Sequence, residues 1–105
     1  MYHLSYPIII DLFKRKCLDF RNIRFVVLDE ADEIVAIEEV ETETTLTPEE
    51  GKQWRDYANL GYPLHLFVPI EKRDRALEIL KTTPNIPTNI GLRSYVIVEG
   101  KVVIL

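Results

Sequence analysis

The sequence has little cysteine and no long apolar run, and each shortage excludes a class of protein. Cys17 is the only cysteine, so no internal disulfide can form and nothing indicates secretion. The apolar runs are about as long as a strand, which is too short for a membrane-spanning helix. The first residues lack the basic start and long apolar core of a signal peptide. We therefore expect a cytoplasmic protein with no membrane partner.

The sequence also lacks an excess of positive charge. The formal net charge is -4 and the pI is near 5.2, which is the wrong sign for a domain that holds phosphates on a broad basic surface. The charges are unevenly distributed along the sequence: residues 14–24 are basic and residues 29–50 are strongly acidic. Solvated faces of a globular protein are the ordinary explanation for such clusters.

The remaining composition is that of one globular domain. The 105 residues are 47% hydrophobic and 29% charged, which is enough apolar material for a core and too few residues for a second domain. We therefore treat residues 1–105 as a single domain.

The pattern of apolar residues and turn residues predicts eight elements. Pro7 fits the first turn of a helix, residues 29–33 form a polar turn between two strands, and Glu99-Gly100 suits a tight hairpin. The predicted helices are 7–16, 48–60 and 71–81, and the predicted strands are 23–28, 34–41, 64–68, 93–98 and 101–105. The order α-β-β-α-β-α-β-β predicts an α/β fold, a small mixed β-sheet flanked by helices, with a parallel crossover between 34–41 and 64–68.

The clearest local signal is the start of the second predicted helix. Thr47 fits the capping position, Pro48 fits the first helical position, and Glu50 lies three residues after the cap. This spacing predicts a capping box in which Glu50 bonds back to the cap.

Two carboxylates end the strand predicted over residues 34–41. Because side chains alternate along a strand, Glu39 and Glu41 share one face. Such a pair can hold a hard divalent cation, Mg²⁺ or Mn²⁺, through oxygen ligands. Alternatively, the strand reaches the edge of the sheet and both side chains are exposed to water.

A second polar pair lies on the helix that follows. Gln53 and Tyr57 are four residues apart and therefore share one face. They could orient a ligand or the carboxylates of the preceding strand. The alternative is a half-buried amphipathic pair without a role in binding.

The order of these motifs resembles the PD-(D/E)XK nuclease superfamily over about residues 23–105. There, a strand hairpin carries an Asp and then a Glu-x-Lys pair, and many members add Gln-x-x-x-Tyr on the next helix. The resemblance implies a restriction-endonuclease-like fold and metal-dependent phosphodiester hydrolysis on DNA. Glu39 matches the glutamate, Glu41 stands at the lysine position, and Gln53 and Tyr57 match the helical motif. These four would be the catalytic residues, with Glu39 and Glu41 holding Mg²⁺ or Mn²⁺.

The sequence departs from that pattern at two positions. Arg24 stands about where the superfamily has its metal-binding aspartate, and Glu41 replaces the lysine. A degenerate nuclease site and a non-catalytic domain of the same fold therefore both remain open. The second would mediate protein interaction, or form a homodimer through an exposed edge strand or the final hairpin.

Residues 11–34 also resemble a segment of DEAD-box RNA helicases. An apolar strand there leads into Asp29-Glu30-Ala31-Asp32, and the resemblance implies Mg²⁺ and water activation by Asp29 and Glu30. However, the chain has no Gly-x-x-x-x-Gly-Lys-Ser/Thr loop to hold nucleotide phosphates. We therefore interpret the tetrapeptide as a polar hairpin turn, with a fused origin as the alternative.

Overall fold

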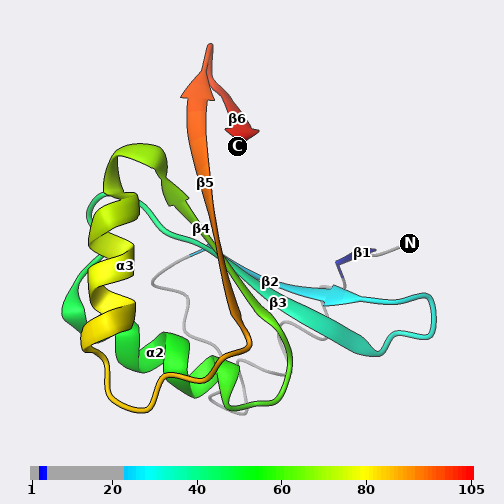
Figure 1. The fold of residues 1–105 in the computed structure, drawn as a ribbon. Helices are drawn as coiled ribbons and strands as arrows, with labels where there is room; N and C mark the ends of the chain where they lie inside the picture. Colours follow the sequence, from blue (N-terminus) through cyan, green and yellow to red (C-terminus); the bar gives the residue numbers. More distant parts are fainter. Residues whose placement is uncertain (1–2, 5–22) are drawn as a thin grey trace.

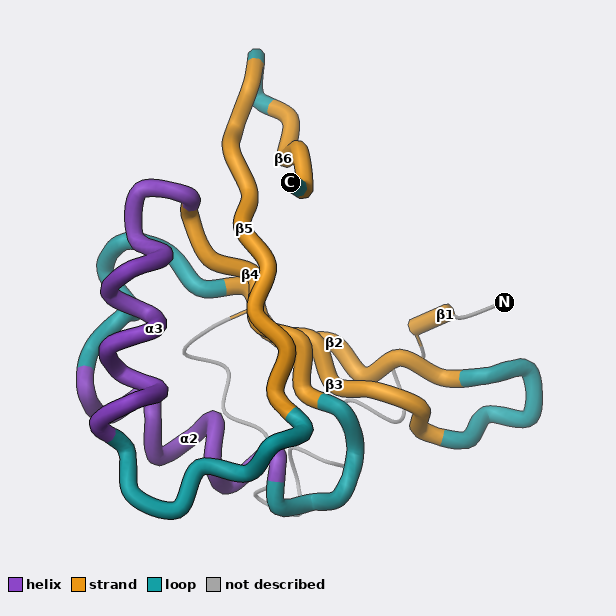
Figure 2. The backbone as a smooth tube through the Cα atoms, viewed as in Figure 1, coloured by secondary structure: helices purple, strands orange, loops and turns teal. Residues whose placement is uncertain are grey.

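A computed structural model describes residues 3–4 and 23–105, and the helix predicted over residues 7–16 lies outside them. The described chain forms one six-stranded sheet in the order β1 to β6 (Figures 1 and 2). The strands are β1 (His3–Leu4), β2 (Ile23–Leu28), β3 (Ile34–Val40), β4 (Leu64–Pro69), β5 (Ile90–Val98) and β6 (Lys101–Ile104). The helices are α2 (Pro48–Ala58), the 3-10 turn η1 (Ile70–Lys72) and α3 (Arg73–Thr82).

The sheet is mixed, as the sequence predicted. The pairs β1–β2, β2–β3 and β5–β6 are antiparallel, whereas β3–β4 and β4–β5 are parallel. Helices α2 and α3 supply the two crossovers between the parallel strands. The mixed α/β class, both hairpins and the parallel crossover are therefore confirmed.

Several boundaries differ from the prediction, each for a local reason. Strand β5 begins at Ile90 instead of residue 93 because its backbone pairs with β4 from Leu64 onward. Helix α3 begins at Arg73 because the preceding three residues form the 3-10 turn η1. Helix α2 ends at Ala58, and Gly61 beyond it has a φ of 97°, a left-handed conformation that suits glycine.

Both helices lie on the same side of the sheet, while the β2–β3 and β5–β6 hairpins extend away from them (Figure 1). The main core lies between the helices and the central strands. Trp54 is its largest fully buried side chain. Its other members are Val26, Leu28, Ile37, Leu46, Tyr57, Ala58, Leu64, Leu66, Val68, Ala76 and Ile79. Because β3 and β4 form the middle of this layer, side chains near their ends that face α2 are removed from water.

The loop between α3 and β5 is fixed by one asparagine. The Nδ2 of Asn89 donates hydrogen bonds to the carbonyl oxygens of Ala58 at 2.9 Å and Tyr62 at 2.8 Å. The backbone carbonyl of Asn89 accepts a hydrogen bond from the N–H of Leu64 at 2.9 Å. These bonds join the end of α2, the start of β4 and the start of β5, and so hold α2 in place over the sheet.

The two helices are short. Helix α2 has 11 residues and α3 has 10, whereas a bilayer crossing takes about 20. Within residues 3–4 and 23–105, no helix has the length and apolar character needed to span a membrane.

Candidate metal site

Glu39 and Glu41 lie at the end of β3 and are both fully buried, with 0% exposure. Glu39 is paired in register with the buried Leu66 of β4. Glu41 follows β3 directly, and its N–H donates to the Phe67 carbonyl at 2.9 Å, which continues the pairing by one residue. The alternation therefore brings both carboxylates to the helix side of the sheet, and the alternative of a water-exposed strand end is wrong.

A third carboxylate, Glu50 from the first turn of α2, joins this pair. It is only 5% exposed. One carboxylate oxygen from each of Glu39, Glu41 and Glu50 can be chosen so that all three lie within 4.8 Å of one another. We call these three residues the carboxylate cluster. The sequence reasoning placed Glu39 and Glu41 together but missed Glu50.

Glu50 was missed because its spacing from Thr47 was interpreted as a capping box, and that interpretation is wrong. Thr47 is the N-cap of α2, but its side chain makes no capping hydrogen bond. The Thr47 hydroxyl instead bonds to the Glu49 carboxylate. The backbone hydrogen bond of Glu49 is the main cause of the lowered pKa of Glu49, and the bond from Thr47 lowers this pKa further. Glu50 points into the protein, and its own N–H bonds to the Thr47 carbonyl at 3.0 Å.

Within the carboxylate cluster, Glu41 strongly favours protonation. Burial raises the pKa of Glu41 to about 10, with further contributions from Glu39 and then Glu50 through charge repulsion and hydrogen bonding. No basic side chain in the described part of the chain lowers it. At neutral pH, without a cation, Glu41 therefore keeps its proton and shares it within the carboxylate cluster.

Gln53 and Tyr57 continue the α2 face that carries Glu50. Their positions are three and seven residues after Glu50, a spacing that keeps them on one side of a helix. Tyr57 is buried in the core and Gln53 is half-buried. The periodic set Glu50, Gln53 and Tyr57 is the sequence signal that would have identified Glu50.

Arg24 occupies the register position directly across β2 and β3 from Glu39. The sequence placed Arg24 at the position of the superfamily's aspartate, and that alignment stays a prediction. No acidic residue of the described β2 takes this place, since β2 reads Ile-Arg-Phe-Val-Val-Leu.

The carboxylate cluster fits a hard divalent cation. Such ions bind oxygen ligands at about 2.0–2.6 Å, so two ligands on opposite sides of the ion are about 4–5 Å apart. The oxygens of Glu39, Glu41 and Glu50 fall within that spacing at 4.8 Å or less. A cation would also neutralise carboxylates that are costly to bury as anions.

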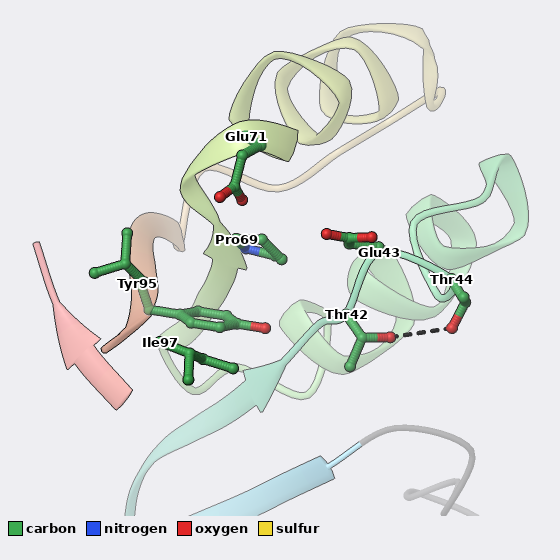
Figure 3. A pocket seen from close by; sticks show the side chains of 8 residues that line it. Thr42, Glu43, Thr44, Pro69, Glu71, Tyr95 and Ile97 are labelled. Carbon is green, nitrogen blue, oxygen red and sulfur yellow. Dashed lines mark hydrogen bonds between the residues drawn. The ribbon is translucent and has the colours of Figure 1, made fainter. Parts of the chain in front are cut away.

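A groove opens at the carboxyl ends of the parallel strands (Figure 3). Its volume is about 460 Å³, and it is lined by Thr42, Glu43, Thr44, Pro69, Glu71, Tyr95, Val96 and Ile97. The Tyr95 hydroxyl donates a 2.7 Å hydrogen bond to the carbonyl of Glu41. Burial raises the pKa of Tyr95, and the charges of Glu41, Glu43 and Glu71 raise it further. The groove therefore adjoins the backbone of Glu41 and is negative in potential, while the buried side chains of the carboxylate cluster do not line it.

The acidic turn of the helicase-like segment lies elsewhere. Asp29 Oδ1 accepts the backbone N–H groups of Ala31 at 2.8 Å and Glu33 at 3.1 Å, so it closes the β2–β3 turn. This turn is at the opposite end of β3 from Glu39. Among the described residues, the carboxylate cluster is the group of acidic, histidine or cysteine side chains close enough to share a metal ion.

The fold and site together define a small mixed α/β domain with three buried carboxylates at the end of a strand.

RNA helicase CrhR from Synechocystis sp. (strain ATCC 27184 / PCC 6803 / Kazusa) is 34% identical to the chain over 95 residues. This match covers 88% of the chain and 19% of the helicase, so the chain spans about a fifth of that relative's length.

The match supports the similarity of residues 11–34 to a DEAD-box helicase segment, and at 95 residues it extends well beyond that segment. No protein-family model matches the chain, and no solved structure matches it. Nothing in these comparisons points to the PD-(D/E)XK superfamily, so that resemblance stays a prediction.

Proposed function

We propose that Glu39, Glu41 and Glu50 hold one Mg²⁺ or Mn²⁺ ion, and that the chain is a small metal-dependent phosphodiesterase of the PD-(D/E)XK type. The observation that carries this proposal is the approach of three buried carboxylates to within 4.8 Å. The expected restriction-endonuclease-like fold belongs to the same proposal. The β2–β3 hairpin, the α2 crossover and the parallel β4 support it by their order and pairing.

The three glutamates would have different tasks. Glu39 and Glu50 supply fixed oxygen ligands from the strand and the helix. Glu41 must give up its proton when the ion enters, because a ligating carboxylate is ionised and the pKa of Glu41 without metal is about 10. Metal binding at neutral pH would therefore release a proton. When bound, the ion would supply activation of water and stabilisation of charge on a phosphate.

Gln53 and Tyr57 would support this chemistry as positioning residues. They follow Glu50 along one face of α2, so a shift of either side chain changes how that helix face packs on β3. We assign them the orientation of the carboxylate cluster, not contact with the reacting atoms.

The charge of the groove restricts how a phosphate can approach. Glu43 and Glu71 line it, and the whole chain has a formal charge of -4, so a bare phosphate is repelled. Binding of nucleic acid would therefore depend on the metal. The proposed substrate is DNA, and the similarity to an RNA helicase makes RNA the second nucleic acid to compare.

The test combines metal binding with cleavage. Calorimetric titration of the full chain with Mn²⁺ should show a saturable site that is lost in Glu39→Gln and kept in Glu38→Gln. Glu38 is the matched control because it lies next in the chain, on the opposite face of β3, beside His65 at 3.6 Å. Cleavage of single-stranded DNA, duplex DNA and RNA with Mg²⁺ or Mn²⁺ should follow the same pattern. A flat titration together with intact nucleic acid would remove the proposal.

A second candidate function has its own supporting observation. The final hairpin, β5 with β6, exposes large apolar side chains, as a non-catalytic interaction or dimerisation domain of this fold would. Metal binding without cleavage of any nucleic acid, combined with self-association, would favour this candidate over the enzyme.

A further inference from the structure

The end of the β5–β6 hairpin is apolar on both faces and exposed. Six aliphatic side chains there are between 42% and 66% exposed: Ile97, Val98, Val102, Val103, Ile104 and Leu105. Between Ser94 and Leu105 the only charged residues are Glu99 and Lys101, at the turn. The hairpin extends away from the body of the molecule (Figure 1). A cluster of this kind on a protein surface marks an interaction site.

β6 is also the last strand of the sheet, and one of its edges has no neighbouring strand in the described chain. Natural edge strands are commonly protected by proline, a bulge or several charges. β6 has the sequence Lys-Val-Val-Ile, so the only protective feature within this strand is the lysine at its start. Its apolar part is open to pairing with another strand.

The register fixes which backbone groups face that open edge. Glu99 and Gly100 form a two-residue turn with φ values of 51° and 77°, and the flanking pair Val98–Lys101 is then hydrogen-bonded. Bonded pairs alternate with non-bonded pairs along the hairpin, and the 2.9 Å bond from Leu105 N–H to the Ser94 carbonyl fits this alternation. Val103 therefore bonds to β5, whereas Val102 and Ile104 direct their N–H and C=O groups outward.

We propose that a second copy of this chain pairs with β6, antiparallel and across a two-fold axis at Val103. In that arrangement Val102 of each copy lies opposite Ile104 of the other, and each such pair exchanges two backbone hydrogen bonds. The two sheets then join into one continuous sheet. This inference does not depend on the metal site.

A second copy fits this surface better than another partner for two reasons. The segment Val102–Ile104 is uncharged, so self-pairing brings no like charges together, whereas a nucleic acid would find no positive surface there. The pairing also brings the apolar side chains of Val102 and Ile104 of one copy directly opposite those of Ile104 and Val102 of the other, and cross-strand apolar pairs stabilise a sheet. The interface is isologous, as in most homodimers.

Sedimentation velocity on the full chain at increasing concentration tests this pairing. We expect a reversible monomer–dimer equilibrium, and at least about a tenfold increase in the dimer dissociation constant for Val102→Lys, since two lysines then enter an apolar interface. Leu60→Lys is the matched control. Leu60 is 40% exposed, lies just after α2 and is not part of the hairpin, so this variant should associate like the wild type.

Hydrogen exchange gives a second measurement that does not rely on a variant. The amides of Val102 and Ile104 should become protected as the concentration rises, while that of Val103 is protected throughout. Ile104→Pro removes an outward N–H without removing a bond to β5, and should also weaken the dimer. A chain that stays monomeric at all concentrations, or equal association of Val102→Lys and Leu60→Lys, would overturn the proposal. Concentration-independent exchange at Val102 and Ile104 would overturn it as well.

Discussion

The carboxylates of Glu41, at the end of β3, and Glu50, in the first turn of α2, lie close enough for Glu50 to raise the affinity of Glu41 for a proton. The backbone places them there independently. Parallel pairing with β4 fixes Glu41, and the packing of Trp54 in the core fixes the rotation of α2 and so directs Glu50. Two elements that are stable for other reasons thus hold two acidic groups together, an arrangement that suits the binding of a cation.

The first prediction concerns pH and stability without metal. The folded-state pKa of Glu41 is about 10, above the ordinary value of 4.5, so the folded chain keeps a proton that the unfolded chain loses between these two values. The stabilisation that the folded chain gains from binding this proton is complete below pH 4.5 and is lost as the pH rises to about 10. In EDTA, the free energy of unfolding should fall by up to about 1.4 kcal/mol per pH unit in this range.

Urea denaturation of the wild type and Glu41→Gln at several pH values measures this effect. Glutamine keeps the shape and cannot ionise, so its stability should vary less with pH. Glu43→Gln is the control, because Glu43 is two residues further along and exposed. A wild-type stability that does not change from about pH 5 to about pH 9 would contradict the prediction.

The second prediction concerns stability with metal. A ligand that binds the folded chain alone adds about 2.7 kcal/mol when present at roughly one hundred times its dissociation constant. Mn²⁺ should therefore raise the unfolding midpoint of the wild type, and more strongly above neutral pH, where fewer protons compete for the carboxylate cluster. Glu50→Gln should lose most of this increase, whereas Glu49→Gln, its exposed neighbour on α2, should keep it. Equal responses of the two variants in thermal unfolding would exclude Glu50 as a ligand.

The sequence was sufficient to predict the features that depend on local pattern. The β2–β3 hairpin follows from its polar turn, and the common face of Glu39 and Glu41 follows from alternation along β3. The burial of these two residues was not predictable from alternation alone, because it depends on how α2 packs over the strand end.

Glu50 also shows that local sequence pattern alone does not determine burial. Its spacing from Thr47 suits a capping box, and its spacing from Gln53 and Tyr57 suits a buried helix face, so only tertiary packing decides between the two. The early start of β5 at Ile90 is likewise a tertiary effect, because Gly91 has little intrinsic preference for a strand and pairs only where β4 is already present.

The third prediction concerns Tyr95. Its hydroxyl bonds to the Glu41 carbonyl at 2.7 Å in a buried position, so Tyr95→Phe leaves a buried carbonyl without this donor. The expected loss is about 1–3 kcal/mol of unfolding free energy, with a weaker affinity for Mn²⁺ because the end of β3 is less firmly held. Urea denaturation and calorimetry measure the two effects. If stability falls while Mn²⁺ affinity is unchanged, Tyr95 supports the fold and not the carboxylate cluster.

The fourth prediction concerns Gly51, the fourth residue of α2. Glycine to alanine inside a helix normally stabilises by about 1 kcal/mol, but a Cβ at Gly51 would overlap the Thr83 hydroxyl and lie 3.0 Å from Ile79 Cγ2. The Thr83 hydroxyl cannot turn away without breaking its 2.7 Å bond to the Ile79 carbonyl. Gly51→Ala should therefore push α2 from α3 and destabilise the chain by about 1–3 kcal/mol.

The same change at Gly91 provides the matched control. A Cβ there would lie 3.7 Å from His65 Cδ2, an ordinary contact, so Gly91→Ala should be nearly neutral in urea denaturation. Because Gly51 follows Glu50 directly, Gly51→Ala should also displace that carboxylate and weaken Mn²⁺ binding, whereas Gly91→Ala should not. A stabilised Gly51→Ala variant would contradict the close packing of α2 on α3 at Thr83. It would equally contradict the placement of Glu50 in the carboxylate cluster, because the same packing of α2 holds Glu50 there.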